Sequence, residues 1–132
     1  MIGVDANVLL RHILDDDPVW SKRSSRFLHD FCSPERPGYV NPVTLAEVFW
    51  VLRGRAKHDR AKLALVVEAI LADEHLIVGS RQAVAAALDA YRRGPADFVD
   101  YLVGELNAAA GAIPTYTIDK KALKRPQFAA LP

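Results

Sequence analysis

The chain begins with the sequence MIGVDANVLL (residues 1–10), in which a short apolar run passes into a helical pattern with an aspartate at the junction. Residues 1–4 predict a short buried strand, and residues 7–14 predict a helix. Asp5 therefore follows directly after the strand. Because ligands of open parallel sheets bind at the carboxyl ends of the strands, this junction bears on both the fold and the functional site.

The same alternation of short apolar runs and helical periodicity continues along the chain. Short strands without clear polar alternation, separated by helices, favour a parallel sheet that is covered on both faces. We therefore predict a single three-layer α/β/α domain over residues 1–132, with a central parallel sheet of roughly four or five short strands. Further strands are expected at residues 38–40, 75–78 and 113–118, and helices at residues 19–31, 43–55, 60–72, 81–92, 97–110 and, as a short turn or helix, 120–124.

Composition excludes several classes of protein. The single cysteine, Cys32, excludes a disulfide framework and a cysteine-based zinc site. No apolar stretch approaches the ~18 residues of a membrane-spanning helix, and no basic segment of a signal peptide precedes Asp5, so we expect a cytoplasmic protein with no membrane partner. A net charge of +1, from 17 basic and 16 acidic side chains, excludes a protein that binds nucleic acid by bulk charge alone.

Carboxylates occur where the predicted strands end and the predicted helices begin. Asp119 directly follows the strand at residues 113–118, as Asp5 follows the first strand, while Asp97 and Asp100 begin the helix at residues 97–110. Each has a simpler interpretation as a helix cap or a first-turn residue that favours the helix dipole. Taken singly, that structural interpretation is the more probable one for each of these residues.

Glu47 has a similar simpler interpretation, because Thr44 and Glu47 fit the S/T-x-x-E capping box. Its helix is apolar nearly all round, however, which predicts a buried helix. A carboxylate on a buried helix must be paired, protonated or bound to a cation. Glu47 is therefore a candidate functional residue.

The helix at residues 97–110 carries one polar or small stripe in an otherwise apolar sequence. Asp97, Asp100, Gly104 and Asn107 follow one another at helical spacing, so the stripe faces either a site or solvent. Clustered carboxylates repel one another unless a cation neutralises them, and the hard ions Mg²⁺ and Mn²⁺ prefer oxygen ligands. Such an ion activates water and stabilises a phosphoryl transition state.

Four segments in this order resemble the PIN-domain ribonucleases, and specifically the VapC-type toxins of type II toxin–antitoxin pairs. They are IGVDANVLL (residues 2–10), LAEVFWVL (residues 45–52), GPADFVDYL (residues 94–102) and TYTIDKKA (residues 115–122). The resemblance covers essentially the whole chain. Tyr101 and Gly104 depart from it, because small or aliphatic residues are commoner at both positions.

The resemblance implies a Mg²⁺- or Mn²⁺-dependent endoribonuclease in which three or four acidic side chains share one pocket. It assigns catalysis to Asp5, Glu47, Asp100 and Asp119, and metal binding to Asp5, Asp97, Asp100 and Asp119, with Asp100 favoured over Asp97 as the direct ligand. Asn7 and Thr117 would support the site. Lys120, Lys121 and Arg11 are candidate RNA-binding residues, although such runs are more often solvated helix ends and a surface role for Arg11 is equally plausible.

The resemblance also implies partners: a cognate antitoxin that inserts a segment near the acids, and a second copy of the chain in a homodimer. Residues 19–31 and the helix from Val43 are reasonable places for apolar partner contacts, or else ordinary core helices. The four histidines show no metal-ligand spacing and are given no catalytic role.

Two other functions remain open from the sequence. A metal-dependent phosphatase of another α/β family is disfavoured, because Asn7 stands where haloacid-dehalogenase-type phosphatases carry a second aspartate. A non-catalytic PIN-like binding module is disfavoured because a scaffold without activity has no reason to keep its acids clustered. Turnover of a small phosphate ester, and stabilisation by Mn²⁺, discriminate these from a ribonuclease.

Overall fold

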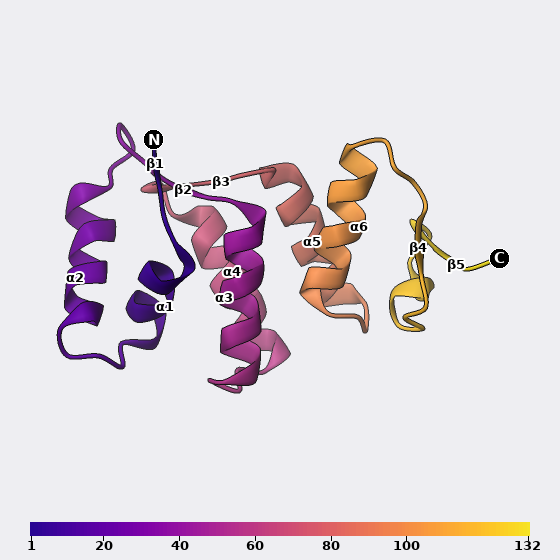
Figure 1. Ribbon diagram of the computed structural model, residues 1–132, viewed down its shortest axis with the longest axis horizontal. Helices are drawn as coiled ribbons and strands as arrows, with labels where there is room; N and C mark the ends of the chain where they lie inside the picture. Colours follow the sequence, from indigo (N-terminus) through magenta and orange to yellow (C-terminus); the bar gives the residue numbers. More distant parts are fainter. The chain divides into compact units, whose positions relative to one another are not determined.

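The computed structural model describes all 132 residues, which divide into two compact units, Met1–Gly79 and Ser80–Pro132 (Figure 1). Both units mix helices with short parallel strands, as an α/β chain is expected to do. The five strands form two separate sheets, rather than the one sheet of the sequence-based prediction. None of the helices has the length and apolar character that crossing a membrane requires.

The first unit is built on a three-stranded parallel sheet in the order β1-β2-β3. Gly38 of β2 lies opposite both Ile2 of β1 and Leu76 of β3, which fixes the register of all three strands. The elements of this unit are β1 (Ile2–Gly3), α1 (Ala6–Leu14), α2 (Trp20–Arg26), a π-helix (Phe27–Phe31), β2 (Gly38–Val40), α3 (Pro42–Gly54), α4 (Arg60–Ala72) and β3 (Leu76–Val78).

Local sequence signals explain where the helices of the first unit begin. Asn41 precedes Pro42 and accepts a hydrogen bond from the backbone N–H of Thr44 at 2.9 Å, so α3 begins with an asparagine cap and a proline in its first turn. Asp59 caps α4 in the same way through Lys62. The capping box predicted for Thr44 and Glu47 is therefore wrong, because the helix begins two residues before Thr44.

The helix predicted over residues 19–31 is divided into two forms. It begins as the α-helix α2 and continues as the π-helix at Phe27, where the wider turn leaves Cys32 N–H bonded to the Phe27 carbonyl at 2.9 Å. Apolar spacing does not distinguish the two forms, since both present side chains on a helical face.

The second unit pairs two helices side by side and adds a two-stranded parallel sheet (Figure 1). Buried aromatic side chains join the helices: the rings of Tyr91 and Phe98 meet edge to face with centroids 6.1 Å apart. The elements are α5 (Arg81–Arg93), α6 (Phe98–Ala109), β4 (Thr115–Thr117), a 3₁₀-helix (Ala122–Lys124) and β5 (Phe128–Ala130).

Strand β5 has no counterpart in the sequence-based prediction, although it is the partner of β4. Thr115 lies opposite Phe128, and Thr117 lies opposite Ala130. The sequence of β5 is Phe-Ala-Ala, which lacks the β-branched residues that mark a strand. The two carboxylates that follow strands therefore follow different sheets: Asp5 follows β1 in the first unit, and Asp119 follows β4 in the second.

Candidate functional site

The second unit brings three of the predicted carboxylates together. Asp97 is the N-cap residue of α6, Asp100 lies in the first turn of that helix, and Asp119 follows β4. Asp97 occupies the cap position without making a side-chain cap hydrogen bond, so capping does not account for its carboxylate. All three side chains are partly buried.

The carboxyl of Asp100 has a raised pKa, and the other two carboxylates contribute to it. Burial raises the pKa of this carboxyl above its ordinary value of 3.8, and the negative charges of Asp119 and Asp97 raise it further. A hydrogen bond between the carboxyls of Asp100 and Asp119 acts in the same direction, whereas the backbone N–H of Asp97 donates to Asp100 and lowers its pKa. The fold thus holds like charges together at a net electrostatic cost.

Asp119 is held by its own loop. Its backbone N–H donates to the Thr117 hydroxyl at 3.0 Å, and its carboxylate accepts the backbone N–H of Lys121 at 2.9 Å. These two bonds are typical of a turn and fix the direction in which the carboxylate leaves the strand. Thr117 therefore contacts the backbone of Asp119 directly.

The C-terminal half of the stripe on α6 packs against the two-stranded sheet instead of facing an open site. Asn107 donates a hydrogen bond to the Thr115 hydroxyl at 3.1 Å. Gly104 is buried beneath Phe128, whose ring occupies the space that a Cβ would take. Of the stripe, only Asp97 and Asp100 lie near Asp119, and we call these three residues the carboxylate group. The expectation that the whole stripe faces a site is therefore wrong for Gly104 and Asn107.

Asp5 lies in the first unit as the N-cap residue of α1. Its carboxylate accepts the backbone N–H of Asn7 at 3.3 Å, and both residues are exposed. The capping interpretation of Asp5 is therefore confirmed as a structural role, which leaves the carboxylate's remaining lone pairs open to solvent.

Glu47 is exposed, in contrast to the expectation from the apolar sequence of its helix. It shares the exposed side of α3 with Val43 and Trp50, whose side chains are 68% and 55% exposed. The core-facing side of α3 is instead formed by Leu45, Val48, Phe49 and Leu52. Composition alone overestimated the burial of this helix, because its exposed face also carries large apolar residues.

The basic candidates differ in their surroundings. The Arg11 guanidinium lies 3.4 Å from the Asp16 carboxylate and 4.0 Å from that of Asp17, which favours the surface role over a free RNA contact. Lys120 and Lys121 are both exposed and follow Asp119 directly. They are the cations closest in sequence to the carboxylate group.

No set of three or more histidine, cysteine, aspartate or glutamate side chains is arranged to hold a metal ion. The hydrogen-bonded carboxyls of Asp100 and Asp119 nevertheless supply the oxygen ligands that hard cations prefer. Such ions complete their coordination shells with water. Two protein ligands from this pair, with the charge of Asp97 beside them, fit Mg²⁺ or Mn²⁺ better than a soft metal.

The structure also brings together three of the four histidines, which sequence spacing gave no reason to group. The rings of His12 and His29 lie 5.5 Å apart between centroids, and those of His29 and His75 lie 6.4 Å apart. His12 shares a 2.7 Å hydrogen bond with the Ser25 hydroxyl, and His75 donates through Nδ1 to the Leu28 carbonyl at 3.2 Å. Their elements are distant in sequence, so only the tertiary fold reveals this histidine group.

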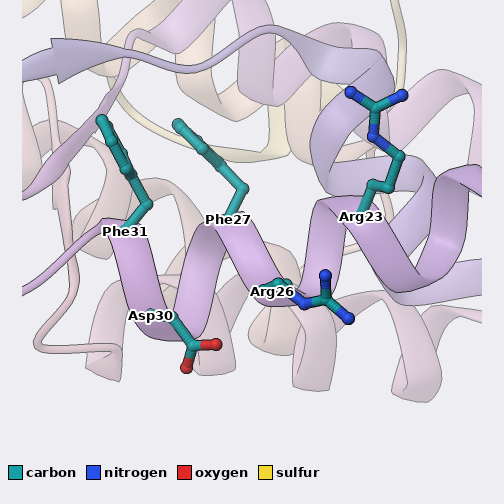
Figure 2. Close-up of a pocket in the computed structure, with 5 residues that line it drawn as sticks. All are labelled: Arg23, Arg26, Phe27, Asp30 and Phe31. Carbon is teal, nitrogen blue, oxygen red and sulfur yellow. The ribbon is translucent and has the colours of Figure 1, made fainter.

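The surface of α2 and the π-helix carries exposed aromatic rings among arginines, and Figure 2 shows Phe27 and Phe31 on one side of the helix with Asp30 on the other. The two phenylalanine rings stack with centroids 5.3 Å apart, and the Arg36 guanidinium covers Phe31 at 3.9 Å. Trp20, 52% exposed, is covered by Arg23 at 4.5 Å. This is an apolar surface with a positive rim.

Comparison of the chain with protein-family models, with curated protein sequences and with solved structures found no match.

Proposed function

We propose that this protein is a Mg²⁺- or Mn²⁺-dependent endoribonuclease, and that the carboxylates of the second unit bind its metal. The observation that carries the proposal is the grouping of Asp97, Asp100 and Asp119, which burial and mutual repulsion make unfavourable in the absence of a cation. The family resemblance of the four sequence segments supplies the reaction class. A group kept at an electrostatic cost is typical of a functional site.

In this mechanism Asp100 and Asp119 hold the ion, and Asp97 adds negative charge beside them. A bound divalent ion would supply Lewis acidity toward a phosphodiester and a lower pKa for water at neutral pH. Thr117 and the backbone of Lys121 keep Asp119 in place, and Asp97 N–H keeps Asp100 in place. Exposed Lys120 and Lys121 would contact RNA phosphates.

The proposal includes finer features that rest on the resemblance. Asp5, supported by Asn7, and Glu47 would act in the same reaction, Asp5 as a metal ligand and Glu47 by orienting or deprotonating the attacking water. The whole chain would form one PIN-like three-layer domain that acts in the cytoplasm. Both acids of the first unit are exposed, so neither is withdrawn from reaction by burial.

From the resemblance we further propose that the protein is a toxin that forms a homodimer and is neutralised by a cognate antitoxin. The exposed aromatic and arginine surface of α2 and the π-helix supports a protein partner, since exposed apolar patches with polar rims mark interaction sites. Light scattering of the purified chain tests the homodimer: a protomer mass at all concentrations would contradict it.

The nuclease proposal is tested by incubating antitoxin-free protein with single-stranded RNA in Mn²⁺ and sequencing the new 5′ ends. Asp100→Asn is the diagnostic variant. Asp89→Asn is its matched control, because Asp89 is an exposed aspartate of the same unit that pairs with Arg93. We expect specific cleavage by the natural chain and by Asp89→Asn, and none by Asp100→Asn.

Three outcomes would overturn the proposal. Equal cleavage by Asp100→Asn would place the activity elsewhere or in a contaminant. Turnover of a small phosphate ester without RNA cleavage would favour the phosphatase, and neither activity together with no Mn²⁺ binding would favour a non-catalytic module.

A further inference from the structure

Tyr101 is a large side chain with a polar hydroxyl near the start of α6, and the function proposed above gives it no role. It is 2% exposed, and it lies on α6 next to Asp100. A buried tyrosine needs a partner for its hydroxyl. That partner is the backbone N–H of Ala96, which donates to the Tyr101 hydroxyl at 3.1 Å in a buried environment.

Gly94 shows that the hydroxyl occupies a fixed place. A Cβ built on this residue would collide with the Tyr101 hydroxyl. The turn from Gly94 to Asp97 is therefore closed over the end of the tyrosine, with no space for a larger side chain at its first residue.

Hydrogen bonds connect this turn to the carboxylate group one residue later. Ala96 is bound by Tyr101, and the N–H of the next residue, Asp97, donates to the Asp100 carboxylate. Asp100 in turn shares a hydrogen bond with Asp119. A displacement of the Ala96–Asp97 backbone would thus turn Asp100 away from the position in which it meets Asp119.

We propose that Tyr101 is a positioning residue for the metal-binding carboxylates: its hydroxyl fixes the Ala96–Asp97 backbone, which orients Asp100 toward Asp119. This inference rests on the proposed function, because it assumes that Asp100 and Asp119 bind a divalent ion. Tyr101 touches neither the metal nor the substrate and acts only through the backbone of the turn.

The test uses Tyr101→Phe in the full chain, with Tyr116→Phe as the control, because Tyr116 is a 59% exposed tyrosine of the same unit. Mn²⁺ affinity is measured by calorimetry at a temperature at which all variants are folded by circular dichroism. We expect Tyr101→Phe to weaken Mn²⁺ binding roughly 10-fold, the lower end of the effect of removing groups that orient metal ligands. Tyr116→Phe should leave it unchanged.

Two further readouts separate positioning from a general loss of stability. Amide hydrogen exchange in the metal-free protein should accelerate at Ala96 and Asp97 more than in the core of α5. Gly94→Ala, which displaces the hydroxyl, should weaken Mn²⁺ binding in the natural chain but less so in the Tyr101→Phe background, where no hydroxyl remains to collide.

The outcomes distinguish the two proposals. If the natural chain binds Mn²⁺ and Tyr101→Phe binds it equally well, with unchanged exchange at Ala96 and Asp97, the role of Tyr101 is wrong and the metal site stands. If the natural chain binds no Mn²⁺, the proposed function fails, and the role of Tyr101 in metal binding fails with it.

Discussion

The histidine group of the first unit and the carboxylate group of the second unit are formed by the same kind of packing but differ in how they avoid repulsion. In both, side chains of one kind that are distant in sequence lie close together, and His12 and Asp100 are each partly buried. Burial and a like charge lower the pKa of His12 and raise that of Asp100, so each of these two side chains resists ionisation. Histidines lose their charge near neutral pH, whereas clustered carboxylates lose theirs only in acid.

The difference indicates which group needs a ligand. In the histidine group, His12 shares a hydrogen bond with the Ser25 hydroxyl and His75 donates to the Leu28 carbonyl, so both rings have partners within the protein. A bound cation would relieve the repulsion among the carboxylates at neutral pH. We therefore propose that the carboxylates, rather than the histidines, bind the metal, and the predictions below test this contrast in order of decreasing effect.

Among variants of the first unit, the largest effect is expected from Asp5→Asn, which separates the structural role of Asp5 from its proposed catalytic role. Asparagine caps a helix as well as aspartate does, so the free energy of unfolding should change by about 0.5 kcal/mol or less. RNA cleavage should fall on the order of 100-fold, because a metal ligand contributes several kcal/mol of transition-state stabilisation.

Asp59→Asn provides the control for that prediction, because Asp59 caps α4 through Lys62 N–H at 2.8 Å and has no proposed part in the reaction. It should retain full cleavage. Full cleavage by Asp5→Asn as well would restrict the function of Asp5 to capping.

Glu47→Gln should lower cleavage without loss of stability, since Glu47 is exposed.

Gly104→Ala tests the packing of α6 against strand β5. Its Cβ would collide with the Phe128 ring, and overpacking of this kind typically costs about 1–3 kcal/mol in the free energy of unfolding. In Gly54→Ala, at the end of α3, the added Cβ meets no atom within 4 Å. This variant should raise the free energy of unfolding by no more than about 1 kcal/mol. Urea denaturation measures both, and equal effects would contradict the close packing of Gly104 on β5.

A smaller effect on stability is expected from Asp100→Asn. The raised pKa of Asp100 means that the folded chain binds its proton more tightly than the unfolded chain. Ionisation of Asp100 therefore lowers stability as pH rises above 3.8, and the loss is complete above the folded pKa. The neutral variant should be more stable than the natural chain at pH 7 and lose this advantage below pH 3.8.

Asp89→Asn is again the matched control, and it should show no stabilisation at pH 7, because it removes an exposed aspartate that pairs with Arg93 at 3.0 Å. Thermal unfolding over a range of pH measures both variants in metal-free buffer. A less stable Asp100→Asn at pH 7 would show that the carboxylate group is favourable and needs no cation.

The smallest effect is expected in the histidine group. Burial and the charge of His29 lower the pKa of His12, against the opposing influence of Asp73 and Asp15. The unfolded chain then binds the proton more tightly, so the contribution of His12 to stability is present above pH 6.5 and is lost as pH falls below that value. His12→Gln should reduce the decline in stability between pH 7.5 and pH 5.5, and an unchanged decline would contradict this role.

Sequence patterns predicted most elements of the fold but not their assembly. The strand at residues 38–40 and the helix at residues 60–72 have the predicted bounds, because turns and caps delimit their apolar runs. Strand β5 and the π-helix were not predicted, since neither differs in local pattern from its surroundings. Pairing of β4 with β5 is a long-range choice that no local pattern encodes.

The candidate site could be predicted in the same partial way. Spacing placed Asp97 and Asp100 on one helix and Asp119 after a strand, but that these three lie near one another came only from the resemblance, because their meeting depends on the tertiary fold. The predicted burial of Glu47 was wrong, because an apolar sequence does not reveal which face of a helix is covered. The histidine group was missed because His12, His29 and His75 meet only through the tertiary fold.

The most direct test of the central claim is a calorimetric titration of Mn²⁺ into the metal-free chain and into Asp100→Asn and Asp89→Asn. The account predicts saturable binding by the natural chain and by Asp89→Asn, with affinity reduced at least roughly 10-fold in Asp100→Asn. Absence of saturable binding by the natural chain, or equal affinity in Asp100→Asn, would contradict it.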